Sequence, residues 1–420
     1  MNDDTLPAAL RYFPLTGRPR PACLTLPERV AEVTVITRAA RQAGADVAHH
    51  AAHALNKAAL LASDCGLDDL ARDLCWRHID AYCGLGRALA VTEARGILEP
   101  ALNLARLAIR QSDCEQALRV LDSIYQALTE GTDLSISGKM LPLAGLAVTQ
   151  AEYRKLREWA WLQHLSEGIR ANALLGRWNA AERHAIQHRG IGDHLLEGRQ
   201  AAIITRLVSG NQTEAAQILA DSTVTEPWEQ SVAACLSVMC ADEQQVNALA
   251  AKLADGFTAA EPVPGYAVYR ARLGLTIVTL AAEPQPAAAT RTARTVAAEA
   301  IASADGNAAR EVLRHQHASS RLPPAQLQSL RSILDAAGLA AGSIAEPFRS
   351  ELLTAAAVAG CQLRAALHSP GDDGRPSRMN QQPTAGPSPA TRSPTGQPAP
   401  RSRRSGTWAA CSASGTAPSP

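Results

Sequence analysis

The chain has 420 residues, of which 46% are hydrophobic, 19% charged and only 4% aromatic. Its 41 basic and 40 acidic side chains give a formal net charge of +1, so no overall electrostatic attraction draws it toward nucleic acid or an anionic membrane. The scarcity of aromatic residues, and the lack of alternating Val, Ile and Thr runs, disfavour a β-sandwich or β-barrel and predict an all-α fold.

The first 27 residues contain five prolines, so residues 1–27 are expected to form an extended, proline-rich segment. This segment has neither the basic start nor the apolar stretch of a secretory signal. No apolar run approaches the roughly 18 residues that a membrane span needs. Nine cysteines scattered over apolar positions indicate free thiols in a reducing compartment. We therefore expect a cytoplasmic protein without membrane contact.

Apolar residues at helical spacing predict a first helix from about Glu28 to Gln42. Loops are expected at 130–137 and, because of two prolines, at 256–265. The other predicted helices span 46–63, 67–81, 92–111, 114–129, 141–165, 227–240, 242–254, 266–282, 288–303, 324–337 and 346–367. These runs define a helical repeat domain over 28–255 and further alanine-rich helices over 266–368 that continue it.

Between 165 and 228, one helix-turn-helix pattern occurs twice. Gly176 is followed five residues later by Ala181, and Gly210, 34 residues after the first glycine, is followed by Ala215. Glycine permits a left-handed backbone where the first helix of each pair ends, and the small alanine permits close packing of the second. The pattern therefore predicts two stacked pairs of antiparallel helices.

Two weaker copies lie upstream, where Gly66 precedes Ala71 and Ser112 precedes Ala117 at the same offset. The 34-residue period and these residue types resemble the tetratricopeptide repeat family over about 48–228. Two positions where that family commonly carries glycine hold Ile169 and Ile203, and the earlier steps of 46 and 64 residues indicate inserted helices or longer loops. The few lysines relative to arginines are typical of a GC-rich bacterial genome.

The resemblance implies a right-handed α-solenoid whose concave groove binds a protein or peptide partner, without enzymatic activity or a cofactor. The family pattern places five residues in that groove: Arg170, Asn172, Arg177, Trp178 and Arg206. The alternative is a sensor or effector component of a bacterial regulatory system that acts through a partner. Neither the charge nor the proline-rich start favours direct nucleic-acid binding.

A third alternative, a metal-binding enzyme, depends on the first helix pair. His49 and His53 are four residues apart on one predicted helix, and Cys75 and His78 are three apart on the next. The two pairs lie at similar distances along their helices from the turn at Gly66. Their four side chains could therefore bind one zinc ion together. Cys75 and His78 also occupy positions where helical repeats keep buried packing residues, and this packed-core interpretation is favoured.

Other candidate motifs are weaker still. His184 and His188 are also four residues apart, but no acidic residue follows His184 as the HExxH motif requires. The stretch GTDLSISGKM at 131–140 has the wrong glycine spacing for a phosphate-binding loop. After residue 368 the composition becomes rich in Pro, Ser and Arg, so a disordered tail is expected over 369–420.

Overall fold

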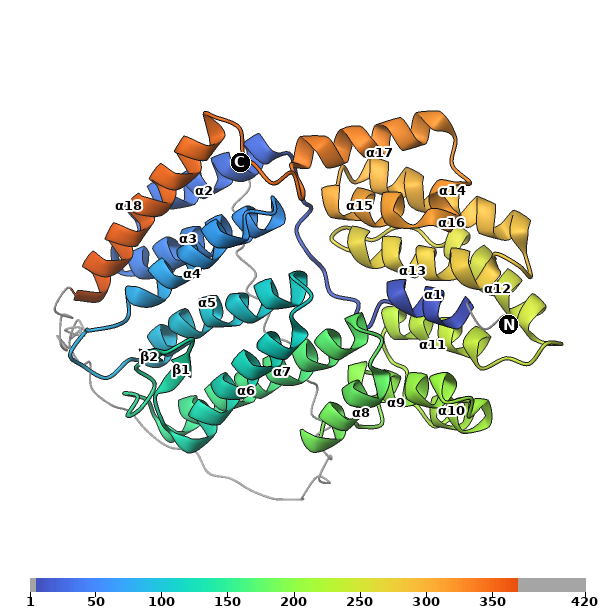
Figure 1. Ribbon diagram of the computed structural model, residues 1–420, viewed down its shortest axis with the longest axis horizontal. Coiled ribbons are helices and arrows are strands. Elements are labelled where there is room, and N and C mark those ends of the chain that lie inside the picture. Colours follow the sequence, from blue (N-terminus) through green and yellow to red (C-terminus); the bar gives the residue numbers. More distant parts are fainter. Residues whose placement is uncertain (1–4, 369–420) are drawn as a thin grey trace, which may run out of the picture. The chain divides into compact units, whose positions relative to one another are not determined.

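The computed structural model describes residues 5–368, and the tail predicted over 369–420 lies outside them (Figure 1). The described residues form eighteen α-helices, one short 3-10 turn and one β-hairpin, which confirms the all-α class of stacked helix pairs. No helix within residues 5–368 combines the length and the apolar character needed to cross a membrane.

Most of the predicted helices are present within a few residues of their expected ends, and three further helices, α1, α15 and α16, are not among the predicted ones. The helices are α1 (Thr5–Tyr12), α2 (Leu26–Ala40), α3 (Val47–Asp64), α4 (Asp68–Asp80), α5 (Val91–Arg110), α6 (Cys114–Glu130), α7 (Gln150–Leu174), α8 (Trp178–Gln187), α9 (Glu197–Val208), α10 (Gln212–Ala220), α11 (Pro227–Met239), α12 (Val246–Ala259), α13 (Ala267–Ala281), α14 (Pro286–Ala302), α15 (Gly306–Arg314), α16 (Gln316–Ser319), α17 (Pro324–Ala337) and α18 (Phe348–His368).

The four predicted turns share one backbone geometry. Each turn residue has a positive φ, and the next residue donates its N–H to the carbonyl five positions back, at 2.8–2.9 Å. This is the hydrogen bond of a Schellman turn. The alanine five residues after each turn is 0% exposed, as close packing of the second helix requires. The turn residues and their φ angles are Gly66 (79°), Ser112 (63°), Gly176 (69°) and Gly210 (76°).

Ser112 holds the left-handed conformation without being glycine, so Ser112→Gly is expected to stabilise the protein by about 1 kcal/mol. The reciprocal change at an equivalent turn, Gly210→Ser, is expected to destabilise it by a similar amount. Urea unfolding of both variants measures the two free energies. Changes of the same sign in the two variants would contradict this explanation.

The buried residues form two large hydrophobic cores. Helices α2–α7 share the first core with α18, and α1 shares the second with α8–α17. Each terminal helix therefore packs far from its neighbours in sequence: α1 lies against α13, and α18 lies against α2 and α3 (Figure 1). An array of repeats stacked only in chain order would not place the last helix beside the first ones.

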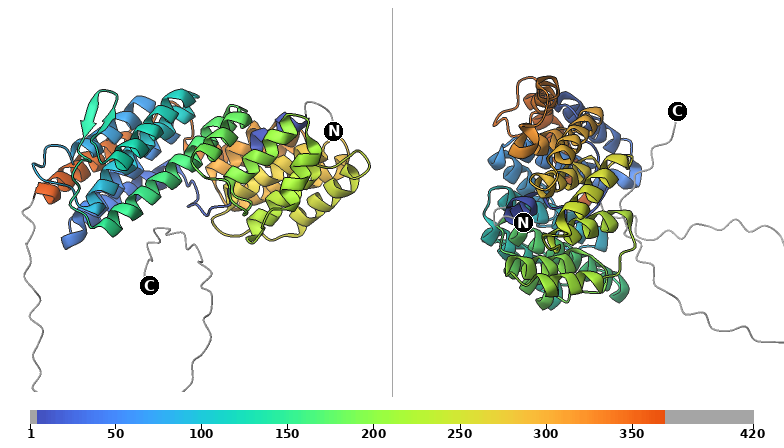
Figure 2. Two further views of the ribbon diagram at one scale, coloured as in Figure 1. Left: turned by 90° about the horizontal axis from the view of Figure 1, so that it is seen from below. Right: turned by 90° about the vertical axis from the view of Figure 1, so that its right-hand side faces the viewer.

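The N-terminal region differs from its expected extended form, because residues 5–12 are helical. Pro7 lies in the first turn of α1, where the missing N–H costs nothing, and Ala9 and Leu10 are buried against the second core. Residues 13–25, called here the connecting segment, form neither a helix nor a strand. They pass between the two groups of helices on the way to α2 (Figure 1, Figure 2).

Three expected boundaries are corrected. The expected loop at 130–137 contains strand β1 (Leu134–Ile136), which pairs antiparallel with β2 (Lys139–Leu141). Helix α7 begins at Gln150 rather than at 141, because Thr149 and Glu152 form a capping box there. The expected loop at 256–265 begins only after Ala259, since α12 continues through Gly256.

Candidate functional site

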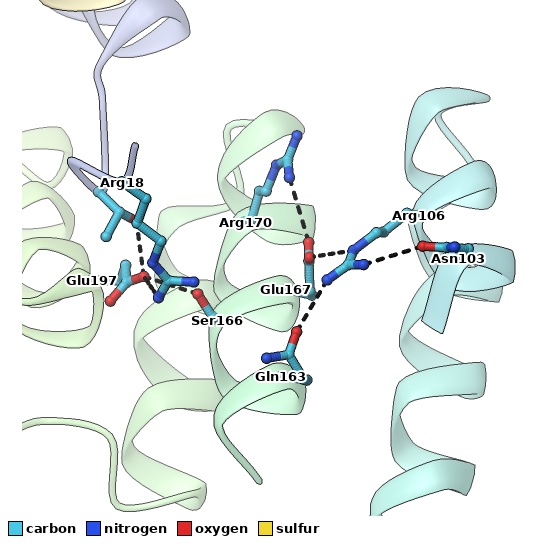
Figure 3. A network of polar contacts seen from close by, with 9 residues as sticks. Arg18, Asn103, Arg106, Gln163, Ser166, Glu167, Arg170 and Glu197 are labelled. Carbon is cyan, nitrogen blue, oxygen red and sulfur yellow. Dashed lines mark hydrogen bonds and ion pairs between the residues drawn. The ribbon is translucent and has the colours of Figure 1, made fainter. Parts of the chain in front are cut away.

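Glu167 on α7 is the centre of a network of charged side chains (Figure 3). The residue is 8% exposed and lies on the face of α7 that packs against α5. Arg106 of α5 donates from Nε to Glu167 Oε1 at 2.7 Å, and Arg170, one turn further along α7, approaches Oε2 at 3.6 Å. One carboxylate is therefore shared by two guanidinium groups.

Neutral side chains fix the orientation of Arg106. Its Nη2 donates to Gln163 Oε1 at 3.0 Å and its Nη1 donates to Asn103 Oδ1 at 3.1 Å (Figure 3). Gln163 is one turn before Glu167 on α7, and Asn103 is one turn before Arg106 on α5. The planar guanidinium is thus held in place before any ligand arrives.

The connecting segment is attached beside this network through Glu197 of α9. Glu197 Oε1 accepts hydrogen bonds from Thr16 Oγ1 at 2.9 Å and from Ser166 Oγ of α7 at 2.9 Å. Arg18 Nη2 lies 3.4 Å from the same oxygen (Figure 3). The Glu197 carboxylate therefore joins the segment to α7.

Close backbone packing holds the segment on both sides of Arg18. A Cβ at Gly17 would lie 2.4 Å from Trp228 Cβ, so no larger residue fits there without displacement. The Arg20 backbone N–H donates to the Gly265 carbonyl at 2.7 Å. The path of the segment is fixed, and with it the position from which the Arg20 side chain extends.

Several arginines act electrostatically on one another around the network. Removal of water lowers the pKa of Arg20, and Arg170 and Arg106 lower it further against the opposing effect of Glu167. Burial likewise lowers the pKa of Arg170, as do Arg272, Arg106 and Arg110. The Arg170 side chain is 47% exposed, so it still contacts water.

We call this group the arginine cluster, and it is drawn from the connecting segment, α5, α7, α13 and α15. Its carboxylate partners are fewer than its guanidinium groups: Asp64 pairs with Arg110 at 2.9 Å, Glu311 pairs with Arg272 at 3.2 Å, and Glu167 serves two. The cluster comprises Arg20, Arg106, Arg110, Arg170, Arg272 and Arg310.

The five residues predicted to line a groove do not share one surface. Asn172 is 5% exposed and donates from Nδ2 to the Gly168 carbonyl, and Trp178 is 4% exposed in the second core, so neither presents its side chain to a groove. Arg177 pairs with Glu115 at 2.7 Å on the exterior. Arg206 pairs with Glu182 and Glu214. Of the five, Arg170 alone belongs to the arginine cluster.

The four candidate metal ligands of the first helix pair do not converge. His49 and His53 are on the exposed face of α3, whereas Cys75 and His78 are on the buried face of α4. Burial raises the pKa of the Cys75 thiol to about 12, so it is a neutral thiol at pH 7. The two pairs lie at similar distances along the helix axes from the turn at Gly66. Their side chains nevertheless point to different sides of the helix pair.

The comparisons with known proteins give no family. No protein-family model matches the chain, and no match is found among curated proteins or among solved structures. Any functional assignment therefore depends on the geometry of the described residues.

Proposed function

We propose that the protein is a non-enzymatic binding module whose arginine cluster binds an acidic segment of a partner protein. The observation that carries the proposal is the excess of guanidinium groups over carboxylates. Four of the six arginines pair with the three carboxylates of Asp64, Glu167 and Glu311. Within residues 5–368, Arg20 and Arg310 have no ion pair, and Arg310 Nε is buried without a hydrogen-bond partner.

The chemistry of the cluster favours carboxylates on a short peptide. A guanidinium offers paired N–H donors that match a carboxylate, and a donor that is already oriented loses less entropy on binding. Three carboxylates interleave with the arginines, and the chain's formal net charge is only +1, so the positive field is local. This suits a few acidic side chains better than a long nucleic-acid backbone. Paired helices that resemble tetratricopeptide repeats are consistent with peptide binding.

Fluorescence anisotropy with a labelled oligoglutamate, compared with an oligoglutamine of equal length, tests the proposal. We expect binding that weakens with salt, and a loss of at least about tenfold in affinity on combining Arg20→Gln with Arg170→Gln. Glu167→Gln removes a competing carboxylate and is expected to increase affinity.

The matched control is Arg177→Gln, which removes an exposed arginine paired with Glu115 outside the cluster. It should leave affinity unchanged. Equal binding of oligoglutamate and oligoglutamine, or an equal loss in the control, would refute the proposal.

A further inference from the structure

Three histidines gather at the packed face of α7 and α8. His164 is on α7, His184 is on α8, and His188 is one residue beyond the end of α8. One ring nitrogen from each lies within 4.8 Å of those of the other two, and this is the histidine group within residues 5–368 that has metal-ligand spacing. The ring centroids are 4.3–4.8 Å apart.

Two of the rings are oriented by hydrogen bonds from Nε2. His164 Nε2 is 2.6 Å from Asp122 Oδ1 of α6, and His184 Nε2 is 3.1 Å from the His164 carbonyl. Carboxylate and carbonyl oxygens only accept, so each Nε2 carries the proton and each Nδ1 keeps its lone pair. Histidines that bind metals are held in this way, with the second nitrogen donating to a carboxylate or a carbonyl.

The Nδ1 of His164 is buried and, in the described part of the chain, has no hydrogen-bond partner. His164 is 2% exposed, and its ring stacks on Tyr125 at 5.1 Å. An unpaired buried acceptor destabilises the folded state, and coordination of a cation would remove that cost. The unpaired atom therefore indicates a ligand that the histidines share.

The backbone is shaped around the second ring. A Cβ at Gly168 would lie 2.2 Å from His184 Nε2, so only glycine lets this ring lie directly on α7. Glycine inside a helix is less favourable than alanine, but here it permits the close approach of His184.

Two of the three histidines lie where burial opposes their protonation. Burial, together with His164, lowers the pKa of His184 to about 4, and burial also lowers the pKa of His188. The hydrogen bond from His164 holds the pKa of Asp122 below its ordinary value, so that carboxylate is negative at neutral pH. The Asp122 carboxylate next to the three imidazole rings favours a cation at this place.

The third histidine opens toward solvent. His188 lines a surface pocket of about 320 Å³ together with Tyr125, Trp161, Gln187 and Arg189. Trp161 Nε1 donates to the His188 carbonyl at 2.8 Å, which fixes the backbone at this point. A metal held by three histidines at this place would have a fourth position facing the pocket, where water or an anion can bind.

We propose that His164, His184 and His188 bind one zinc ion, with Asp122 orienting His164 and the fourth position open to the pocket. Three imidazoles and an open position suit zinc. Tetrahedral zinc with bonds near 2.0–2.1 Å sets the nitrogens about 3.4 Å apart, so the ligand atoms need to approach by up to about 1.4 Å.

Calorimetric titration of the chelator-stripped full chain with Zn²⁺ tests the proposal, and Co²⁺ absorption reports the ligand type. We expect one ion per chain and a tetrahedral Co²⁺ spectrum without thiolate charge-transfer bands. His188→Ala, at a half-buried position, should weaken Zn²⁺ by at least about tenfold, and Asp122→Asn, which keeps all three ligands, by about tenfold.

The control variant, His49→Gln with His53→Gln, removes an exposed histidine pair of the same spacing as His184 and His188. It should bind zinc as the wild type does. Circular dichroism confirms that each variant is folded. Thiolate bands with Co²⁺, no Zn²⁺ binding by the wild type, or unchanged affinity in His188→Ala would overturn the assignment.

Discussion

Replacing His78 with leucine is expected to protect the protein against unfolding by acid. His78 on α4 is 1% exposed, and neither ring nitrogen has a hydrogen-bond partner within residues 5–368. Burial lowers its pKa to about 3, from 6.5 in an exposed histidine. The native state therefore keeps His78 neutral at pH values where the unfolded chain binds a proton.

The sign of the effect follows from proton binding. Below pH 6.5 the unfolded state gains a proton at His78 that the native state does not, so the free energy of unfolding falls as pH falls, until about pH 3. Each pH unit in this window costs about 1.4 kcal/mol. Between pH 7 and pH 5 the loss from this residue is about 2 kcal/mol, and leucine would abolish it.

Urea unfolding at pH 7 and pH 5 measures the difference. At pH 7 leucine should also gain about 1 kcal/mol, because an unsatisfied polar ring is removed. His49→Leu, at an exposed position on the neighbouring α3, should leave the pH dependence of stability unchanged. A His78→Leu protein that loses as much stability between the two pH values as the wild type would show that His78 is protonated in the native state.

The turns and most helices could be predicted because their signals are local. Each turn needs one residue with a positive φ, and this need is set by a few neighbouring residues. Gly66, Gly176 and Gly210 supply it, and Ser112 supplies it although it is not glycine. The packing of α1 on α13 and of α18 on α2 has no local signal. It joins residues more than 250 positions apart through buried apolar side chains, which any other buried helix could have contacted.

The positions of His164 and His188 in the sequence already indicated that they lie close together. His164 lies twelve residues before Gly176, and His188 lies twelve after it, so an antiparallel pair places them level. Counting residues from the turn in the same way also placed His53 at the same position along the helix axis as Cys75 and His78. The structure does not bring those side chains together. The position of a residue along the axis of a helix pair follows from its distance in sequence from the turn. The direction in which its side chain points depends on how the two helices pack.

The arginine cluster could not be predicted by counting residues from a turn. Arg20, Arg106 and Arg170 come from the connecting segment, α5 and α7, and only the tertiary structure brings them to Glu167.

Helix α7 belongs to both candidate sites, since His164 lies one turn before Glu167. A metal bound between α7 and α8 would restrain the helix that positions Glu167 and Arg170.

Glu167→Ala is expected to destabilise the protein by about 3 kcal/mol, because it leaves two guanidinium groups without their carboxylate. This is the lower end of the range for broken buried pairs, since Arg106 and Arg170 are 36% and 47% exposed. Burial raises the pKa of Glu167, but Arg106 and Arg170 together outweigh this and hold it below its ordinary value of 4.5. Its contribution is therefore present above pH 4.5 and is lost as pH falls further.

Urea unfolding at pH 7 and at pH 3 measures this contribution. The matched control is Glu115→Ala, which also removes the carboxylate partner of an arginine, but at a pair whose side chains are 53% and 64% exposed. Such exposed pairs contribute at most about 1 kcal/mol. We expect Glu167→Ala to cost clearly more than the control at pH 7, and the gap to narrow at pH 3. Equal losses at pH 7 would mean that water replaces Glu167 at both guanidinium groups.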